Sequence, residues 1–399
     1  MNLHTIAKAT QGLANYLNNC FDLPSVAIAR DSRHKGELFC KVAAGILAAN
    51  GICVYLYPRI EPTPALSFAV RELGCSAGIR MTASRNPAEY NGYKVYGSDG
   101  CQITTATAKA IQASIDAVDI FDGVKSRSFD EAPELGIASW IVDDVPERFL
   151  DACQNASVSD AAGNLKLVYT PLHGAGLECV SKILGRIGVH DAIIEPEQAI
   201  PNGDSPTCPY PNPEVREALE LGFKLAAVEQ ADLLLATDPD ANRVGIAVMK
   251  NDEPNLLTGN EVGILLLDYI CEMRAKRGEN LRDKVACTTI VSSAMTDAVA
   301  VNRGFELRRT LTVFKFIGEQ IGVLEAGGEA DRFIFGFEES YGYLAGMAVR
   351  DKDAVLASML ICEMTRWYSA RGMDLADAMD ALYQKYGYYR NGLISISAM

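Results

Sequence analysis

The sequence of 399 residues lacks paired cysteine motifs: its eleven cysteines include no C-x-x-C pair, and their odd number does not suit a disulfide framework. We therefore expect reduced core cysteines in a cytoplasmic protein. No apolar run approaches the length of about 18 residues that a transmembrane helix needs, and the first residues lack the apolar core of a signal peptide. A basic excess is also missing, because the formal net charge is −14. We therefore expect neither a membrane nor a nucleic acid as a partner.

Apolar residues, in contrast, make up 49% of the chain, and a chain of this length has room for roughly two to four domains with large cores. Strand-like and helix-like patterns alternate in three successive cycles, which predicts three α/β domains in a row. The expected strands lie at 26–29, 53–56, 165–169, 286–291 and 332–335, and the expected helices at 35–49, 65–73, 146–154 and 260–277. The expected domains are 1–138, 139–253 and 254–385, with boundaries near the polar stretches 130–134 and 250–255.

The first candidate site is the turn that begins at Thr82 and carries Ser84 beside two cations, Arg85 and Lys94. It follows the apolar run 74–81, which is typical of a strand, and its Asn-Pro and Asn-Gly pairs predict turns. Ligands of open α/β sheets bind at the carboxyl ends of strands, so Ser84 is a candidate nucleophile or phosphate carrier. An ordinary capped turn is the alternative interpretation.

The second candidate site contains Asp238, Asp240, Asn242 and Arg243, between two strand-like runs. Oxygen ligands at this two-residue spacing can converge on one hard cation such as Mg²⁺, with the arginine beside it for an anion. Two alternatives stay open. One is a plain Asp-Pro-Asp turn, and the other is a phosphatase loop with an aspartyl nucleophile, which would leave Ser84 without a role.

The third candidate site is a glycine-bounded loop with Glu338 and Ser340, whose carboxylate and hydroxyl groups suit the vicinal hydroxyls of a sugar. A solvated acidic turn is the alternative. All three loops lie at strand ends of successive α/β units. We therefore expect Ser84, the Asp238 loop and Glu338 to face one cleft.

In this order, the three loops resemble the α-D-phosphohexomutase superfamily, specifically its phosphoglucomutase and phosphomannomutase members. Further matching motifs lie at 29–33, 170–176, 211–214 and 314–318. The segments 91–100 and 338–344 are similar to the large bacterial phosphoglucomutase-type branch. The resemblance covers nearly the whole chain and implies α/β domains with mixed sheets.

The resemblance implies a mutase that interconverts hexose 1-phosphate and hexose 6-phosphate, with glucose as the expected sugar and a hexose 1,6-bisphosphate as intermediate. The expected cofactor is Mg²⁺, coordinated by phosphorylated Ser84 and by Asp238, Asp240 and Asn242. Such chemistry depends on positioning and on neutralising the charge of the moving phosphoryl group. Lys94 is the expected proton-transfer group. The remaining expected ligands of the phosphate or the sugar are Arg30, Arg85, Arg243, Lys315, Glu338 and Ser340.

Three positions depart from the usual pattern of the family. Arg85 stands where histidine is usual and clamps phosphate without shuttling a proton, Asn242 replaces a third aspartate, and Val313 replaces a glycine. A β-branched residue is unfavourable wherever a loop needs a positive φ. Besides a mutase, two readings stay open: a non-catalytic sugar-phosphate-binding relative, and a phosphopentomutase or bisphosphate synthase.

The two ends of the chain lead us to expect the middle of a longer enzyme. Residues 6–17 have helical periodicity, whereas family members begin with a strand and an arginine-bearing turn. Residues 391–397 alternate as a strand would, and we expect 386–399 to begin a fourth domain that is otherwise absent. In the family that domain grips the phosphate that is not transferred. We therefore expect impaired mutase activity.

Overall fold

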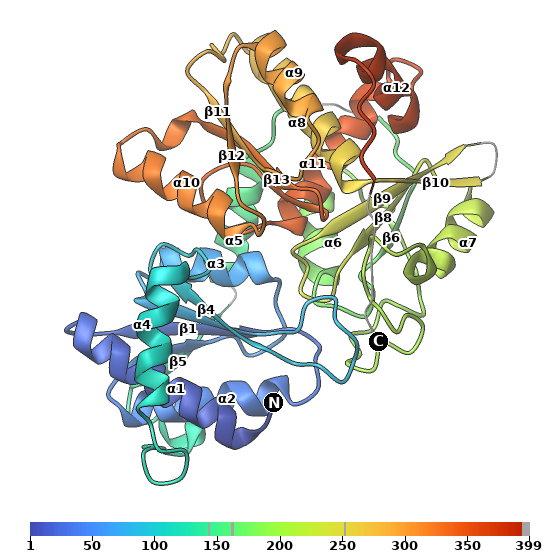
Figure 1. The fold of residues 1–399 in the computed structure, drawn as a ribbon. Coiled ribbons are helices and arrows are strands. Elements are labelled where there is room, and N and C mark those ends of the chain that lie inside the picture. Colours follow the sequence, from blue (N-terminus) through green and yellow to red (C-terminus); the bar gives the residue numbers. More distant parts are fainter. Residues whose placement is uncertain (143, 161–162, 251–252, 393–399) are drawn as a thin grey trace.

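The chain folds into three successive α/β domains, each built on one mixed sheet (Figure 1). The computed structural model describes residues 1–142, 144–160, 163–250 and 253–392. The strand expected over 391–397 lies outside these residues from 393 onwards. Strand polarity agrees with the expected fold class, because every sheet contains parallel and antiparallel pairs.

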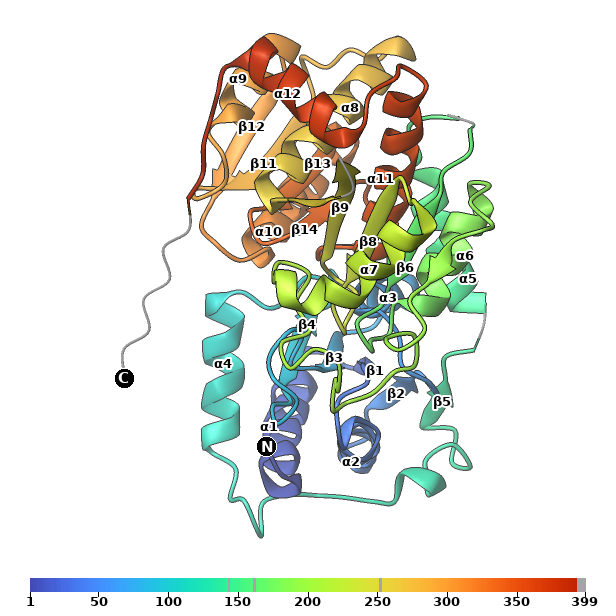
Figure 2. The ribbon, with the colours of Figure 1, turned by 90° about the vertical axis from the view of Figure 1, so that its right-hand side faces the viewer.

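The first domain has a five-stranded sheet of order β4-β3-β1-β2-β5, in which only β4 is antiparallel to its neighbour. Its strands are β1 (Ser25–Arg30), β2 (Cys53–Leu56), β3 (Ala77–Met81), β4 (Tyr93–Gly97) and β5 (Ala138–Trp140). Its helices are α1 (Leu3–Cys20), α2 (Gly36–Ala49), α3 (Thr63–Glu72) and α4 (Thr105–Asp116). Helix α2 packs on one face of the sheet, with α1 against α2 and α4 (Figure 2). Helix α3 covers the opposite face.

Helix α1 forms where the periodicity predicts a helix. Its buried stripe includes Ile6, Leu13 and Leu17, which recur at helical spacing. At its start, the Asn2 side chain accepts from the Thr5 backbone nitrogen at 3.0 Å, and Thr5 Oγ1 accepts from the Asn2 backbone nitrogen. These two hydrogen bonds form a capping box. The local sequence and the tertiary packing therefore agree at this end of the chain.

The second domain has a five-stranded sheet of order β10-β9-β8-β6-β7, with antiparallel pairs on both sides of β9. Its strands are β6 (Leu167–Thr170), β7 (Ile193–Ile194), β8 (Leu233–Thr237), β9 (Val244–Lys250) and β10 (Glu253–Leu257). Its helices are α5 (Asp144–Asn155), α6 (Leu177–Arg186) and α7 (Glu220–Glu229). Continuous burial of β8 is typical of a strand in the middle of a covered sheet.

The third domain has a four-stranded sheet of order β12-β11-β13-β14, with β14 antiparallel to β13. Its strands are β11 (Val285–Thr289), β12 (Glu306–Thr310), β13 (Phe333–Glu338) and β14 (Gly342–Leu344). Its helices are α8 (Gly259–Lys276), α9 (Met295–Arg303), α10 (Lys315–Ala326), α11 (Ala354–Ser369) and α12 (Leu375–Tyr386). Helices α8 and α11 have largely apolar sequences, and most of their residues are accordingly buried.

Two expected domain boundaries fall inside strands. The division at 138 cuts β5, which pairs with β2, and the division at 253 cuts β10, which pairs with β9. Both strands therefore belong to the sheet that precedes the expected boundary. From Glu253 onwards the chain forms the edge strand β10, whose exposure alternates along its length.

The largest apolar core crosses all three domains through α5, α6 and α11. Because this core is continuous, the three sheets are held against one another by packing as well as by polar contacts. Nine cysteines are buried, as expected, whereas Cys20 is exposed and Cys53 half-buried; all eleven are free thiols. Among the described helices, none combines the length and the apolar character that crossing a membrane requires.

Candidate active site

Ser84 lies in the turn after β3 and meets the loop that follows β8. Its Oγ donates to Asp238 Oδ2 at 3.0 Å and to Asp240 Oδ1 at 2.9 Å, across 154 and 156 residues of sequence. The serine has a left-handed backbone conformation, with φ of 52°, held by a 2.7 Å hydrogen bond from its nitrogen to Thr82 Oγ1. Such strain persists only where the surroundings fix it. The two hydrogen bonds of Ser84 therefore join the first two predicted loops in one site.

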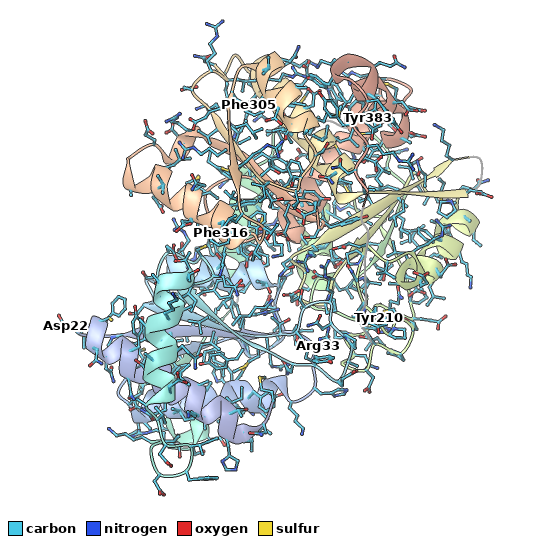
Figure 3. The ribbon with its side chains drawn as sticks, in the orientation of Figure 1. Asp22, Arg33, Tyr210, Phe305, Phe316 and Tyr383 are labelled. Atoms are coloured by element: carbon cyan, nitrogen blue, oxygen red, sulfur yellow. The ribbon has the colours of Figure 1, made fainter. Side chains whose placement is uncertain are left out.

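Arg33 holds the backbone of the serine turn. Its guanidinium donates to the backbone carbonyls of Ser84 and Asn86, and to that of Pro87 at 2.7 Å. Figure 3 shows Arg33 where the first and second domains face each other. Arg30, which we expect from the sequence as a ligand of the phosphate or the sugar, ends β1 and forms an ion pair with Glu37 at 3.5 Å. Arg33 is therefore the arginine that contacts this turn.

The acidic loop is completely buried and highly polar. Asp238 Oδ1 accepts from the backbone nitrogens of Asn242 at 3.0 Å and Arg243 at 2.9 Å. Asp240 Oδ2 accepts from Thr63 Oγ1 and from the Asn242 side chain, both at 2.9 Å, and lies 3.7 Å from Lys94 Nζ. Lys94 reaches Asp240 from β4, an edge strand in a segment where the sequence motifs predicted turns. The first and second domains are thus joined at this loop.

Opposite electrostatic environments act on the two aspartates. Burial, and then the charge of Asp240, raise the pKa of Asp238 to about 7. Burial also favours the neutral form of Asp240, but the charges of Lys94 and Arg80 outweigh it and hold the pKa of Asp240 below its ordinary value. The two aspartates therefore ionise in separate steps, Asp240 before Asp238 as the pH rises.

The loop also offers an oxygen that is free for a cation. Asn242 Oδ1 is buried and has no hydrogen-bond partner among the described residues. With the two aspartates and the Ser84 hydroxyl, it makes a set of hard oxygen donors that suits Mg²⁺ when further oxygens complete the shell. No cluster of three or more His, Cys, Asp or Glu side chains with metal-binding geometry occurs in the described parts of the chain. The donor set therefore fits a magnesium ion only with an added anionic ligand.

The third loop reaches the site through Arg243. Its guanidinium lies 3.4 Å from Glu338 Oε1 at the end of β13, and Lys352 Nζ lies 3.7 Å from the same oxygen. Burial alone would raise the pKa of Glu338, but Lys352 and Arg243 hold it below its ordinary value, with a hydrogen bond from Ser340. All three predicted loops therefore join in one polar network.

Lys352 is a part of this network that the sequence reasoning missed. It lies 3.5 Å from Asp351, whose other oxygen accepts from Tyr96 of the first domain at 2.8 Å. The sequence signal for Lys352 was the run of alternating charges at 350–353 after β14. All four of these residues are buried, and charged side chains are rarely buried unless they are paired. This chain of contacts links the first and third domains behind the candidate site.

Arg85 and Lys315 form an ion pair and a ring contact, respectively, with residues other than Ser84 and the two aspartates. Arg85 forms an ion pair with Glu214 of the second domain, which belongs to the matching motif at 211–214. Lys315 begins α10, with Nζ 5.3 Å from the centroid of the Phe316 ring, which Figure 3 places near the first domain. Val313, two residues earlier, has a φ of 84°. The loop therefore demands the positive φ that suits the glycine usual in the family.

Models of the phosphoglucomutase/phosphomannomutase α/β/α domains match the chain in order: domain I over residues 1–120, domain II over 147–251 and domain III over 258–386. The chain belongs to the phosphoglucomutase/phosphomannomutase family. It is therefore an enzyme of the intramolecular phosphotransferase class, a mutase of the phosphohexomutase type.

Relatives from distant organisms match almost the whole chain. It is 33% identical to a phosphoglucomutase from Staphylococcus saprophyticus, over 98% of this chain and 70% of that protein. It is 35% identical to a probable phosphomannomutase from Haemophilus influenzae, over 99% and 78% of the two chains, and 35% identical to a probable phosphoribomutase from Schizosaccharomyces pombe, over 98% and 67%. The solved parafusin (phosphoglucomutase) of Paramecium shares the fold, with a TM-score of 0.76, 17% identity and coverage of 96% of this chain and 71% of that one.

Proposed function

We propose that this chain interconverts hexose 1-phosphate and hexose 6-phosphate, with glucose as the sugar, through a phosphate carried by Ser84 and a hexose 1,6-bisphosphate. One observation carries the proposal: Ser84 Oγ lies within hydrogen-bond distance of both Asp238 and Asp240. A serine so placed can present a phosphate to the cation that those carboxylates would bind. The free thiols favour the cytoplasm as the compartment.

In the proposed step, the bond between phosphorus and Ser84 Oγ breaks as a bond forms from phosphorus to the free sugar hydroxyl. Ser84 Oγ leaves as a hydroxyl and needs a proton, while the sugar hydroxyl loses one. Lys94 is our candidate for this proton transfer, because its ammonium lies beside Asp240 next to the serine and can give a proton to Ser84 Oγ and regain one from the sugar hydroxyl. Mg²⁺ held by Asp238, Asp240, Asn242 and the phosphoserine would neutralise charge on the transferred group. The second transfer runs in the opposite direction after the bisphosphate has reoriented.

The remaining polar groups would bind the substrate. We propose Arg243 and Arg85 for phosphate oxygens, and Glu338 with Ser340 for two sugar hydroxyls. The ion pair of Glu338 with Arg243 supports this by bringing the third loop to the second. We propose Lys315 for the same sugar or its second phosphate from the start of α10. Arg30, at the end of β1, would assist only if its contact with Glu37 opened.

Intact-protein mass spectrometry tests the proposal directly. After incubation with glucose 1,6-bisphosphate, the wild-type chain should gain the mass of one phosphate, and Ser84→Ala should gain none. Ser114→Ala, a half-buried position on α4 in the first domain, is the control and should behave as the wild type. Phosphate uptake by Ser84→Ala, or its absence in the wild type, would contradict a phosphoserine mechanism.

Impaired turnover, which we expect from the sequence, is supported by the ion pair between Arg85 and Glu214 and by the amide of Asn242. An assay of glucose 1-phosphate conversion measures the turnover. Uptake of phosphate on Ser84 with turnover below about 1 per second would indicate impaired mutase chemistry. Turnover with pentose phosphates alone would favour a phosphopentomutase.

A further inference from the structure

Arg80 is a fully buried cation that the proposed chemistry does not use. It lies on β3, its exposed fraction is 0%, and it is among the largest completely buried side chains. None of its three guanidinium nitrogens has a hydrogen-bond partner within the described residues. A buried charge without hydrogen bonds is strongly destabilising unless nearby charges of opposite sign compensate it.

The strand geometry shows which groups can compensate Arg80. Its neighbours Ile79 and Met81 belong to the core beneath α2, so alternation along β3 directs Arg80 to the other face of the sheet. On that face it is opposite Lys94 of β4 in the strand register. Asp31 and Asp240 are the carboxylates whose ionised forms its charge favours. The compensation of Arg80 therefore comes from the candidate site.

The charges of Lys94 and Arg80 leave Asp240 with little unbalanced negative charge. Lys94 lies 3.7 Å from its Oδ2, and Arg80 adds a second positive charge that cannot be released by deprotonation. Since Asn242 contributes an amide rather than a carboxylate, Asp238 is the one remaining acid of the loop 238–242. Hard divalent cations need anionic oxygens, so this balance opposes their binding to the unphosphorylated site.

We propose that Arg80 is a positioning residue that acts as a resident counter-ion of Asp240 and makes divalent-cation binding at the loop 238–242 conditional on phosphate at Ser84. The phosphate restores the negative charge that Arg80 and Lys94 cancel. The phosphate clause rests on the proposed function, whereas the counter-ion role of Arg80 does not. The coupling ensures that the metal and the phosphate are present together when the sugar binds.

Calorimetric titration of the full 399-residue chain with Mg²⁺ tests the counter-ion role, using protein shown by intact mass to carry no phosphate. Arg80→Met removes the charge and should bind Mg²⁺ about tenfold more tightly than the wild type. Arg80→Lys retains the charge and should bind like the wild type. Arg366→Met is the control, because Arg366 is also buried but donates to the carbonyls of Ile187 and Gly188, away from the site.

Equal or weaker Mg²⁺ affinity in folded Arg80→Met would overturn the proposal, as would tighter binding in Arg80→Lys or in Arg366→Met to the same degree. Circular dichroism establishes folding, and Arg80→Gln is a second neutral variant if the methionine variant unfolds. The wild type offers an independent measurement: its affinity should rise at least about tenfold once Ser84 is phosphorylated. If Ser84 takes no phosphate, the proposed function fails, while the variants still decide the role of Arg80.

Discussion

At the scale of single residues, position 242 determines how much negative charge the loop 238–242 carries. The Asn242 amide contacts Asp240 at 2.9 Å and leaves its Oδ1 without a partner among the described residues. An amide oxygen can still bind a cation, but it brings no charge. A unit charge about 4 Å from an ion is worth at most roughly 4 kcal/mol at an effective dielectric of about 20.

We predict that Asn242→Asp increases the affinity of the unphosphorylated protein for Mg²⁺ by about tenfold or more, because a third carboxylate then faces the cation. Calorimetric titration measures the change. Asn164→Asp adds the same charge at an exposed position of the second domain and should leave the affinity unchanged. An equal gain in both variants would mean that net charge, rather than the local ligand set, controls binding.

At the scale of elements, the loop before α10 contains a residue whose side chain disfavours the backbone conformation that it adopts. Val313 has a φ of 84° and is half-exposed, so little packing compensates the strain of a β-branched residue there. Glycine adopts this backbone conformation without a steric penalty. The strain lies directly before Lys315, a proposed substrate ligand at the start of α10.

We predict that Val313→Gly raises the free energy of unfolding by about 1 kcal/mol, since relief of roughly 1–3 kcal/mol of strain exceeds the added entropy of the unfolded chain. Urea denaturation followed by circular dichroism measures it. Val323→Gly is the matched control, because Val323 is similarly exposed but lies inside α10, where replacing valine by glycine should cost about 0.5 kcal/mol. Loss of stability in Val313→Gly would show that the valine packs favourably.

At the scale of the whole molecule, polar contacts tie the domains together, some on the surface and some buried. His34 and Asp204 join the first and second domains at 2.6 Å, and Glu363 on α11 accepts from Ser157 Oγ at 2.6 Å in the segment after α5. Burial raises the pKa of Glu363 to about 7. The third domain is therefore attached to the second by a carboxyl group that titrates near neutral pH.

The sign of the resulting pH dependence follows from proton binding. Between about pH 5 and pH 7 the unfolded chain has released the Glu363 proton and the folded chain still holds it, so stability falls as pH rises through this window. We predict a slope of up to about 1.4 kcal/mol per pH unit from this group. In Glu363→Gln the slope should shrink, as measured by urea denaturation at several pH values. The exposed Asp331→Asn is the control and should retain the wild-type slope.

Much of the site could be predicted from the sequence, because its parts are local. Turn chemistry and apolar runs place Ser84, Asp238 and Glu338 after strands, and the periodic apolar stripe defines α1. The order of the three loops indicates the family. Their meeting at one site was an expectation from strand ends alone, and the hydrogen bonds of Ser84 and the ion pair of Arg243 with Glu338 agree with it.

The sequence by itself determined the elements, the three α/β domains and the residue types at the site, because propensity, periodicity and turn chemistry act over a few neighbours. Only the tertiary structure decided that Arg33 holds the serine turn, that β5 and β10 join the preceding sheets, and that Lys352 and Arg80 become buried. These outcomes depend on which distant side chains share a buried volume. Burial and charge balance exist only once the three sheets have packed together, so no local pattern contains them.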